Sequence, residues 1–168
     1  MSRQSAAIGT AIFFFVAPGI VAGLIPYLIT FWQFEEMPPT YGIVRGIGVV
    51  LIAAGLAMLI ESFVRFAVEG RGTPAPPAPT EQLVVRGAYR YVRNPMYVAV
   101  AAIILGQVLL FANWLLLIYA ALVVLAFHLF VVFYEEPTLA RTYGAAYDKY
   151  RAAVPRWFPH IPRNPYRT

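Results

Sequence analysis

The feature that most constrains this chain is a long uncharged stretch in its second half. Residues 94–134, 41 in all, include no Asp, Glu, Lys or Arg, and His128 is the only side chain among them that titrates near neutrality. As a helix the stretch would be about 60 Å long, roughly twice the hydrocarbon thickness of a bilayer. It must therefore cross an apolar layer and return, which brings the polar clusters on either side of it to the same face.

Composition indicates a membrane protein. The chain is 60% hydrophobic and only 12% charged, about half the charged share of a soluble domain. It has no cysteine, which excludes disulfides and thiolate chemistry, and its two histidines, His128 and His160, are too few for a histidine metal cluster. The net charge of +5 lacks a basic run, so it indicates membrane topology rather than binding to nucleic acid.

The hydrophobic pattern predicts an all-α fold, an integral membrane helical bundle with about four transmembrane helices and a C-terminal amphipathic helix. The predicted spans are about 6–32, 43–68, 95–110 and 114–134, and the last two form a hairpin that turns at 111–113. The first segment is too long for a signal peptide and lacks a small-residue cleavage signature, so we interpret it as a retained span.

One amphipathic helix is expected after the fourth span. A single stripe of a helix with 3.6 residues per turn collects Leu139, Tyr143, Tyr147, Tyr150 and Val154. Proline at position 155 should end this helix.

The connections predict orientation and domain organisation. The first connection, Gln33–Gly42, carries two glutamates and no cation, whereas arginines and a lysine gather in the second connection and in the tail. Both termini should therefore face the cytoplasm. A Pro-rich linker over 70–80 separates an N-terminal transmembrane hairpin, 1–69, from a catalytic unit, 81–168.

Two pairs of small residues four apart, Gly19 with Gly23 and Ala53 with Ala57, favour close helix packing. The packing can lie inside the chain or in a homodimer, and the pattern does not choose between them.

Candidate site residues lie in the two polar clusters. Arg93 precedes Asn94-Pro95, where Asn94 is an expected N-cap and Pro95 suits the first turn, so free N–H groups should face a ligand carboxylate. Glu135 and Glu136 close the fourth span, where carboxylates oppose the helix dipole. Either they precede a new helix at Pro137, or one of them faces inward and pairs with a cationic ligand group such as an amine.

His128 precedes Glu135 by seven residues, which is two helical turns, so both should project from one face. An inward-facing histidine is a functional candidate, although it can equally be a buried residue bonded to a carbonyl.

These clusters resemble a known family. The pattern Gly87-x-Tyr89-(x)3-Arg93-Asn94-Pro95-x-Tyr97, a short hairpin, Glu135-Glu136-x-x-Leu139 and Gly144-x-x-Tyr147-x-x-Tyr150-(x)3-Val154-Pro155 is similar to the isoprenylcysteine carboxyl methyltransferase family. The superfamily includes phospholipid N-methyltransferases and many bacterial proteins. The resemblance covers about residues 81–159. It implies an enzyme of a bacterial cytoplasmic membrane that uses S-adenosyl-L-methionine and no metal.

The resemblance also implies site roles. Cofactor contacts implied in this way are Gln82, Leu83, Val84, Tyr89, Asn94, Pro95, Met96, Tyr97 and Glu135. The clusters themselves add Arg93, Leu139, Tyr147 and Tyr150 as cofactor candidates. The glutamate would hold the amino group of the cofactor, beneath a covering C-terminal segment. From their positions in the sequence, rather than from the resemblance, the catalytic candidates are His128, Glu136 and Arg156.

Two departures from the family bear on the substrate. Many relatives carry His in place of Asn94, and those acting on prenylcysteine carboxylates carry an Arg one turn before the paired glutamates, where this chain has Phe130-Val131-Val132. The expected acceptor is therefore a small or lipidic molecule entering from the membrane, with His128 beside it. Alternatives are N-methylation of a phospholipid or other amine, a sterol-type reductase using NADPH, and a membrane scaffold without activity.

Overall fold

The computed structural model describes residues 16–69 and 83–160, and all regular structure in these two ranges is helical. The predicted helical class is confirmed for this part of the chain. The first apolar segment is a helix over Val16–Thr30, which contains the π-helical turn η1 (Ile20–Leu24) and the helix α2 (Ile25–Thr30).

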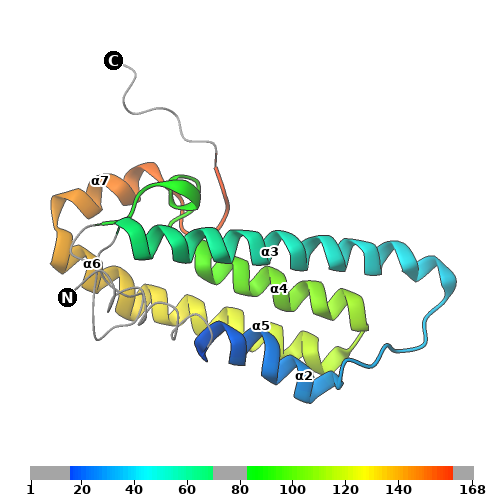
Figure 1. Cartoon of the computed structure of the whole chain (residues 1–168). Coiled ribbons are helices and arrows are strands. Elements are labelled where there is room, and N and C mark those ends of the chain that lie inside the picture. The colour runs from blue at the N-terminus through cyan, green and yellow to red at the C-terminus, as the bar shows by residue number, and fades with distance from the viewer. Residues whose placement is uncertain (1–15, 70–82, 161–168) are drawn as a thin grey trace.

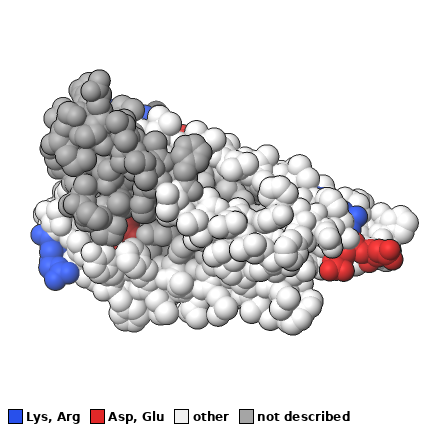
Figure 2. Space-filling view, turned by 60° about the horizontal axis from the view of Figure 1, so that its bottom comes forward, with Lys and Arg blue, Asp and Glu red and all other residues white. Residues whose placement is uncertain are grey.

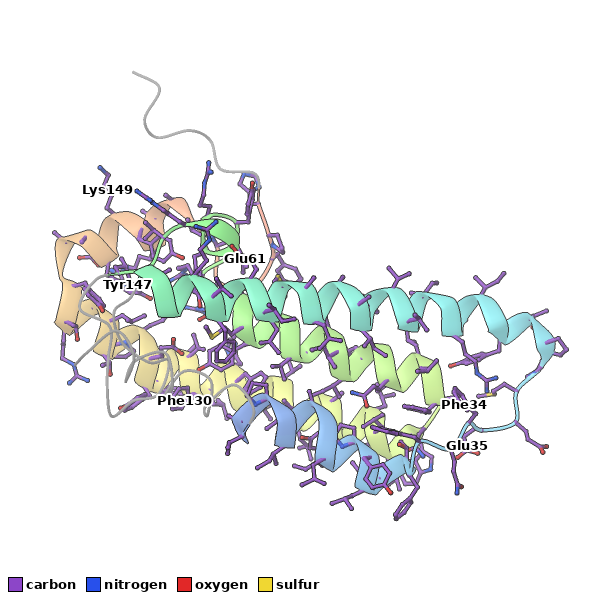
Figure 3. The ribbon with its side chains drawn as sticks, in the orientation of Figure 1. Phe34, Glu35, Glu61, Phe130, Tyr147 and Lys149 are labelled. Carbon is purple, nitrogen blue, oxygen red and sulfur yellow. The ribbon has the colours of Figure 1, made fainter. Side chains whose placement is uncertain are left out.

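Three longer helices form the rest of the bundle and run side by side (Figure 1). After the 3-10 turn η2 (Pro39–Tyr41) they are α3 (Gly42–Glu69), α4 (Pro95–Phe111) and α5 (Trp114–Phe130). The short 3-10 helix η3 (Gly87–Arg90) precedes α4. We call the end where α3 finishes and α4 begins the site end, and the opposite end, with Phe34 and Glu35, the far end (Figure 3).

The predicted hairpin turn is confirmed. Ala112 adopts a left-handed conformation with φ 57° after α4, and the side chain of Asn113 accepts a hydrogen bond from Leu116 N at 3.0 Å. A left-handed residue followed by an Asn cap ends one helix and starts the next within two residues.

Within the described ranges, two helices are long and apolar enough to cross a bilayer, Pro39–Arg65 and Trp114–Tyr143. Val16–Thr30 and Pro95–Phe111 are apolar but shorter. Figure 2 shows an almost uncharged waist with charged side chains gathered towards the two ends, the pattern expected of a surface facing lipid.

The sequence predicted that the fourth helix ends at the paired glutamates, and this prediction is wrong. From α5 the helix continues through a π-helical turn, η4 (Val131–Glu135), into α6 (Glu136–Tyr143). Glu135 and Glu136 therefore lie inside a continuous helix, and the unfavourable interaction with a helix C-terminus does not arise.

The expected single amphipathic helix is also wrong, because Gly144 breaks it. Gly144 has φ 52° and ψ −127°, and the chain turns there from α6 into a separate helix, α7 (Ala145–Ala153). The predicted stripe nevertheless packs together, with Tyr147, Tyr150 and Val154 buried against the partly buried Leu139 and Tyr143. The periodicity identified the contacts, while the glycine decided the path.

The two π-helical turns share a local cause. Each ends two residues before a proline, η1 before Pro26 and η4 before Pro137. A proline has no N–H, and its ring clashes with the carbonyl four residues earlier, so a wider turn ahead of it lets the helix continue.

Close packing between helices occurs at other glycines than those predicted. A Cβ atom at Gly106 of α4 would lie 2.6 Å from the carbonyl oxygen of Gly48 in α3, so the two backbones nearly touch there. Gly19 and Gly23, by contrast, face open space among the described residues, and Ala53 and Ala57 are exposed. These two pairs do not mediate packing within the described part of the chain, and the homodimer stays a prediction.

Candidate functional site

A cavity of about 140 Å³ lies at the site end of the bundle. The first helix, α3, α4 and α5 contribute to its apolar wall, and the segment before α4, the first turn of α4 and η4 provide its polar wall. The lining residues are Ala17, Pro18, Val21, Leu59, Phe63, Tyr89, Arg93, Asn94, Pro95, Met96, Tyr97, Val100, Phe127 and Glu135. Four separate stretches of sequence thus build one cavity with a charged side and an apolar side.

Glu135 provides the acidic group of the cavity. Its Oε2 accepts a hydrogen bond from the Tyr97 hydroxyl at 2.9 Å, and the Tyr97 ring packs against Phe127 with centroids 4.8 Å apart. Among the ion pairs between described residues, none includes Glu135. A carboxylate that has only a neutral phenol as partner suits a positively charged ligand group.

Glu136, one residue later, points into an ion-pair cluster. Arg156 binds it with two hydrogen bonds, Nε to Oε1 at 2.7 Å and Nη2 to Oε2 at 2.9 Å, and the Nη1 of Arg93 lies 3.0 Å from Oε1. The hydrogen bonds to Glu136 raise the pKa of the Arg156 guanidinium. Two guanidinium groups and one carboxylate leave this cluster with one net positive charge.

Arg93 connects that cluster to the cavity. Its side chain is 12% exposed, its Nη1 donates to the Tyr147 hydroxyl at 3.3 Å, and its backbone N–H donates to Pro155 O at 2.9 Å. Its Nε is buried and has no hydrogen-bond partner among the described residues. Buried donors are nearly always paired, and Arg93 lines the cavity, so this N–H is a candidate donor to a ligand acceptor.

Tyr89 enters the cavity wall from η3. It is buried, and Tyr150 of α7 donates a hydrogen bond to its carbonyl at 2.7 Å. Burial raises the pKa of the Tyr89 phenol well above its usual value, and the nearby Glu135 carboxylate raises it further. Tyr89 therefore stays neutral and presents an aromatic face.

The end of the described chain closes over the segment before α4. Asn94 Nδ2 donates to Arg156 O at 3.1 Å, and His160 N donates to Tyr91 O at 3.0 Å. Asn94 is the N-cap residue of α4 as predicted, but its side chain makes no capping hydrogen bond, since its amide is used for this contact with the tail.

Many of the predicted cofactor residues meet at the cavity. The residues of that set which line it are Tyr89, Arg93, Asn94, Pro95, Met96, Tyr97 and Glu135. Leu83, Leu139, Tyr147 and Tyr150 belong instead to the cluster around α7, Val84 is buried apart from both, and Gln82 lies outside the described residues.

His128 is not brought to the cavity, contrary to the expectation from its spacing. It is exposed, and its Nδ1 accepts a hydrogen bond from Trp157 Nε1 at 3.2 Å. The reason is the π-helical turn between His128 and Glu135, which has a different number of residues per turn and removes the two-turn register. Its predicted alternative, a bond to a carbonyl, is not what the structure shows either.

Sequence reasoning missed the contribution of the first half of the chain. Ala17, Pro18 and Val21 come from the first helix, and Leu59 and Phe63 come from α3. The apolar character of these residues carries no signal that distinguishes a cavity wall from a surface facing lipid.

The fold and the site define a helical membrane protein with a partly charged cavity at one end of its bundle. A family model described as phospholipid methyltransferase matches residues 44–146, so the chain belongs to that family and is an integral membrane protein. The superfamily predicted from the sequence motifs is confirmed.

A curated relative supports the same superfamily. The chain is 36% identical over 80 residues to the protein-S-isoprenylcysteine O-methyltransferase of Schizosaccharomyces pombe. The match covers 48% of this chain and 34% of that relative, so the chain matches only about a third of the length of the relative.

Proposed function

We propose that this protein is a methyltransferase that transfers the methyl group of S-adenosyl-L-methionine to a lipophilic acceptor in the membrane. The observation that carries the proposal is the pair of ligand-seeking groups on one cavity wall. Among the described residues, Glu135 has no cationic partner and Arg93 Nε has no acceptor. Together they match the ammonium and the carboxylate of the cofactor's methionine portion.

Neighbouring features fit the same ligand. The α4 N-terminus begins at Asn94, and the N–H groups of its first turn have no acceptor within the helix, so they support a carboxylate near Arg93. Rings of Tyr89, Tyr97 and Phe127 line the cavity, and aromatic faces attract a positively charged sulfonium.

The bound cofactor would supply an electrophilic methyl group, which a nucleophilic acceptor takes in one in-line displacement without a covalent enzyme intermediate. The residues of this chain would align the reactants and exclude water. Glu136, held by Arg156, would fix the Arg93 guanidinium beside the cavity. Glu136 and Arg156, two of the predicted catalytic residues, would thus have a supporting role.

The acceptor is proposed to approach along the apolar wall. Val21, Leu59, Val100 and Phe127 form this wall, deeper in the bundle than the charged residues. Two classes of acceptor are candidates. The family description favours a phospholipid, and the name of the Schizosaccharomyces pombe relative favours an isoprenylcysteine that is methylated on oxygen. The one net positive charge of the cluster around Glu136 is already assigned to the carboxylate of the cofactor, so it does not favour a carboxylate acceptor over a phospholipid.

Binding and transfer test this proposal. Calorimetry in detergent should show binding of S-adenosylhomocysteine and no binding of NADPH. Labelled methyl groups should then pass from the cofactor to a component of a membrane lipid extract or to a prenylcysteine analogue, and the preferred arm identifies the acceptor class. NADPH binding without binding of the S-adenosyl ligand would favour a reductase, and binding of neither would favour a scaffold.

We also propose four spans with both termini in the cytoplasm. Supporting this, the helices alternate in direction, so residues 33–38 and 112–113 lie at the far end, while η3, α7 and residues 154–160 lie at the site end. Arg45 also lies at the far end, where it donates to Glu35 O at 2.6 Å and covers the Phe34 ring. We propose that the division into 1–69, 70–80 and 81–168 describes the order of the sequence and does not mark separately folded domains. The support is that α3, from the first part, packs along α4, from the last.

Cysteine labelling tests the topology. The whole chain has no native cysteine, so single cysteines at Thr40 and Thr80 report position without background. Reagents that do not cross the membrane should label Thr40→Cys from outside and Thr80→Cys from inside. Labelling of both from one side would contradict the four-span arrangement.

A further inference from the structure

A carboxylate on α3 contacts the segment that carries Tyr89. Glu61 Oε2 accepts a hydrogen bond from the backbone N–H of Ala88 at 3.2 Å, and Glu61 Oε1 accepts one from Arg65 Nε at 3.0 Å. Glu61 lies within the apolar helix Pro39–Arg65 and its side chain is 37% exposed. An acidic residue in such a helix is costly unless it is paired, and here its partners are a neighbouring cation and a distant backbone amide.

Gly87 shows how closely this segment rests on the carboxylate. A Cβ atom at Gly87 would overlap Glu61 Oε1 and would lie 3.0 Å from Arg65 Nε. Gly87 also has φ 61°, a left-handed conformation that disfavours any side chain. Two separate features of the structure therefore require glycine at this position.

The contact lies one residue from the cavity. η3 is only four residues long, so a shift at Ala88 moves Tyr89, whose ring lines the cavity. On its other side Tyr89 is held through its carbonyl by Tyr150. Glu61 from the first half of the chain and Tyr150 from α7 thus hold the same short helix from two directions.

We infer that Glu61 is a positioning residue of the site, whose carboxylate sets the conformation of residues 87–90 and so the placement of Tyr89 against the ligand. Glu61 is not among the residues that line the cavity, so it acts through the backbone of Ala88 rather than by touching ligand. This inference rests on the proposed function for its effect on the cofactor, while the anchoring contact itself does not.

Hydrogen exchange tests the anchoring without any ligand. In detergent, Glu61→Ala should increase amide exchange in peptides covering 84–91 and leave peptides of α5 unchanged. Glu61→Gln, which keeps an acceptor oxygen, should restore most of the protection. Glu35→Ala, which removes an exposed carboxylate at the far end (Figure 3), is the matched control and should change neither region. Unchanged exchange over 84–91 in Glu61→Ala would overturn the inference.

Ligand binding tests the consequence. Glu61→Ala should weaken binding of S-adenosylhomocysteine by about tenfold, the effect of losing one hydrogen bond to a charged acceptor, whereas Glu61→Gln should stay within about threefold of wild type. The KM for the methyl donor should rise by a similar factor while kcat changes less. If Glu61→Ala fails to fold, Glu61→Asp keeps the charge but shortens the side chain by one methylene, which draws the carboxylate away from the Ala88 N–H, and it should give the same pattern.

The two failures are distinguishable. A wild-type protein that does not bind the S-adenosyl ligand contradicts the proposed function, and the exchange measurement still decides the anchoring. A wild-type protein that binds, with a folded Glu61→Ala variant that binds equally well, overturns the inference alone.

Discussion

The site end and the middle of the bundle handle buried polar groups in opposite ways. In the middle, Pro26 and the π-helical turn η1 leave two carbonyls of the first helix without helical donors. Gln107 of α4 donates to Ala22 O at 2.7 Å, and Tyr119 of α5 donates to Val21 O at 2.7 Å. Both carbonyls are thereby satisfied by neutral side chains from two other helices.

At the site end the polar groups are charged and their pairing is incomplete. Arg93 Nε lacks a partner among the described residues, and Glu135 has only the Tyr97 hydroxyl. The contrast separates two uses of the same physics. The satisfied network fixes one wall of the bundle, and the incompletely paired one lies where we propose that the ligand binds.

The largest effect on binding is expected for Glu135→Ala. Loss of its charge-assisted contact should weaken binding of the S-adenosyl ligand by about 1.5–3 kcal/mol, roughly 10- to 150-fold. Calorimetry in detergent measures the change. Glu135→Gln, which keeps the contact with Tyr97 but not the charge, should fall between Ala and wild type. Wild-type affinity in Glu135→Ala would contradict the proposal that Glu135 binds the amino group of the ligand.

In the middle of the bundle, Gln107→Leu should mainly affect stability. The variant leaves the carbonyl of Ala22 buried without a donor, at a cost of about 1–3 kcal/mol. Thermal unfolding in detergent should show the loss, with a smaller change in ligand affinity. Thr142→Ala, which removes an exposed hydroxyl bonded within its own helix, is the control. A loss of ligand affinity without a loss of stability would contradict the structural role of Gln107 and would assign it to ligand binding.

Tyr119→Phe should give a smaller loss of the same kind. It removes one hydroxyl and keeps the ring, so the packing of Tyr119 is retained and only the bond to Val21 O is lost. We expect about 0.5–1.5 kcal/mol in the unfolding free energy. Combined with Gln107→Leu, the loss should differ from the sum of the two, because both residues hold the same turn.

The smallest effect is expected for His128→Ala. His128 is exposed and contacts Trp157, so the change in stability should stay within about 0.5 kcal/mol, and binding of the S-adenosyl ligand should be unchanged. Methyl transfer is the measurement that matters here. A large fall in kcat with binding intact would restore the catalytic role that the sequence predicted.

Local patterns predicted much of the architecture. The helix starting at Asn94-Pro95, the turn at 111–113 and the apolar helices follow from proline, asparagine and hydrophobic runs whose effects act within one or two turns. The motifs around Tyr89, Arg93 and Glu135 identified the family and most of the polar wall of the cavity.

Only the tertiary structure decided which polar groups meet. Glu61 with Ala88, Asn94 with Arg156, and Gln107 with Ala22 join residues 27, 62 and 85 positions apart, and no local pattern encodes such pairs. The register of His128 also depends on a π-helical turn that a regular periodicity does not anticipate. By itself the sequence determined most of the helices, the turn at 111–113 and the family, because those follow from neighbouring residues. The site needed the packed bundle, because each of its polar contacts is chosen by the partners that folding places within hydrogen-bond distance.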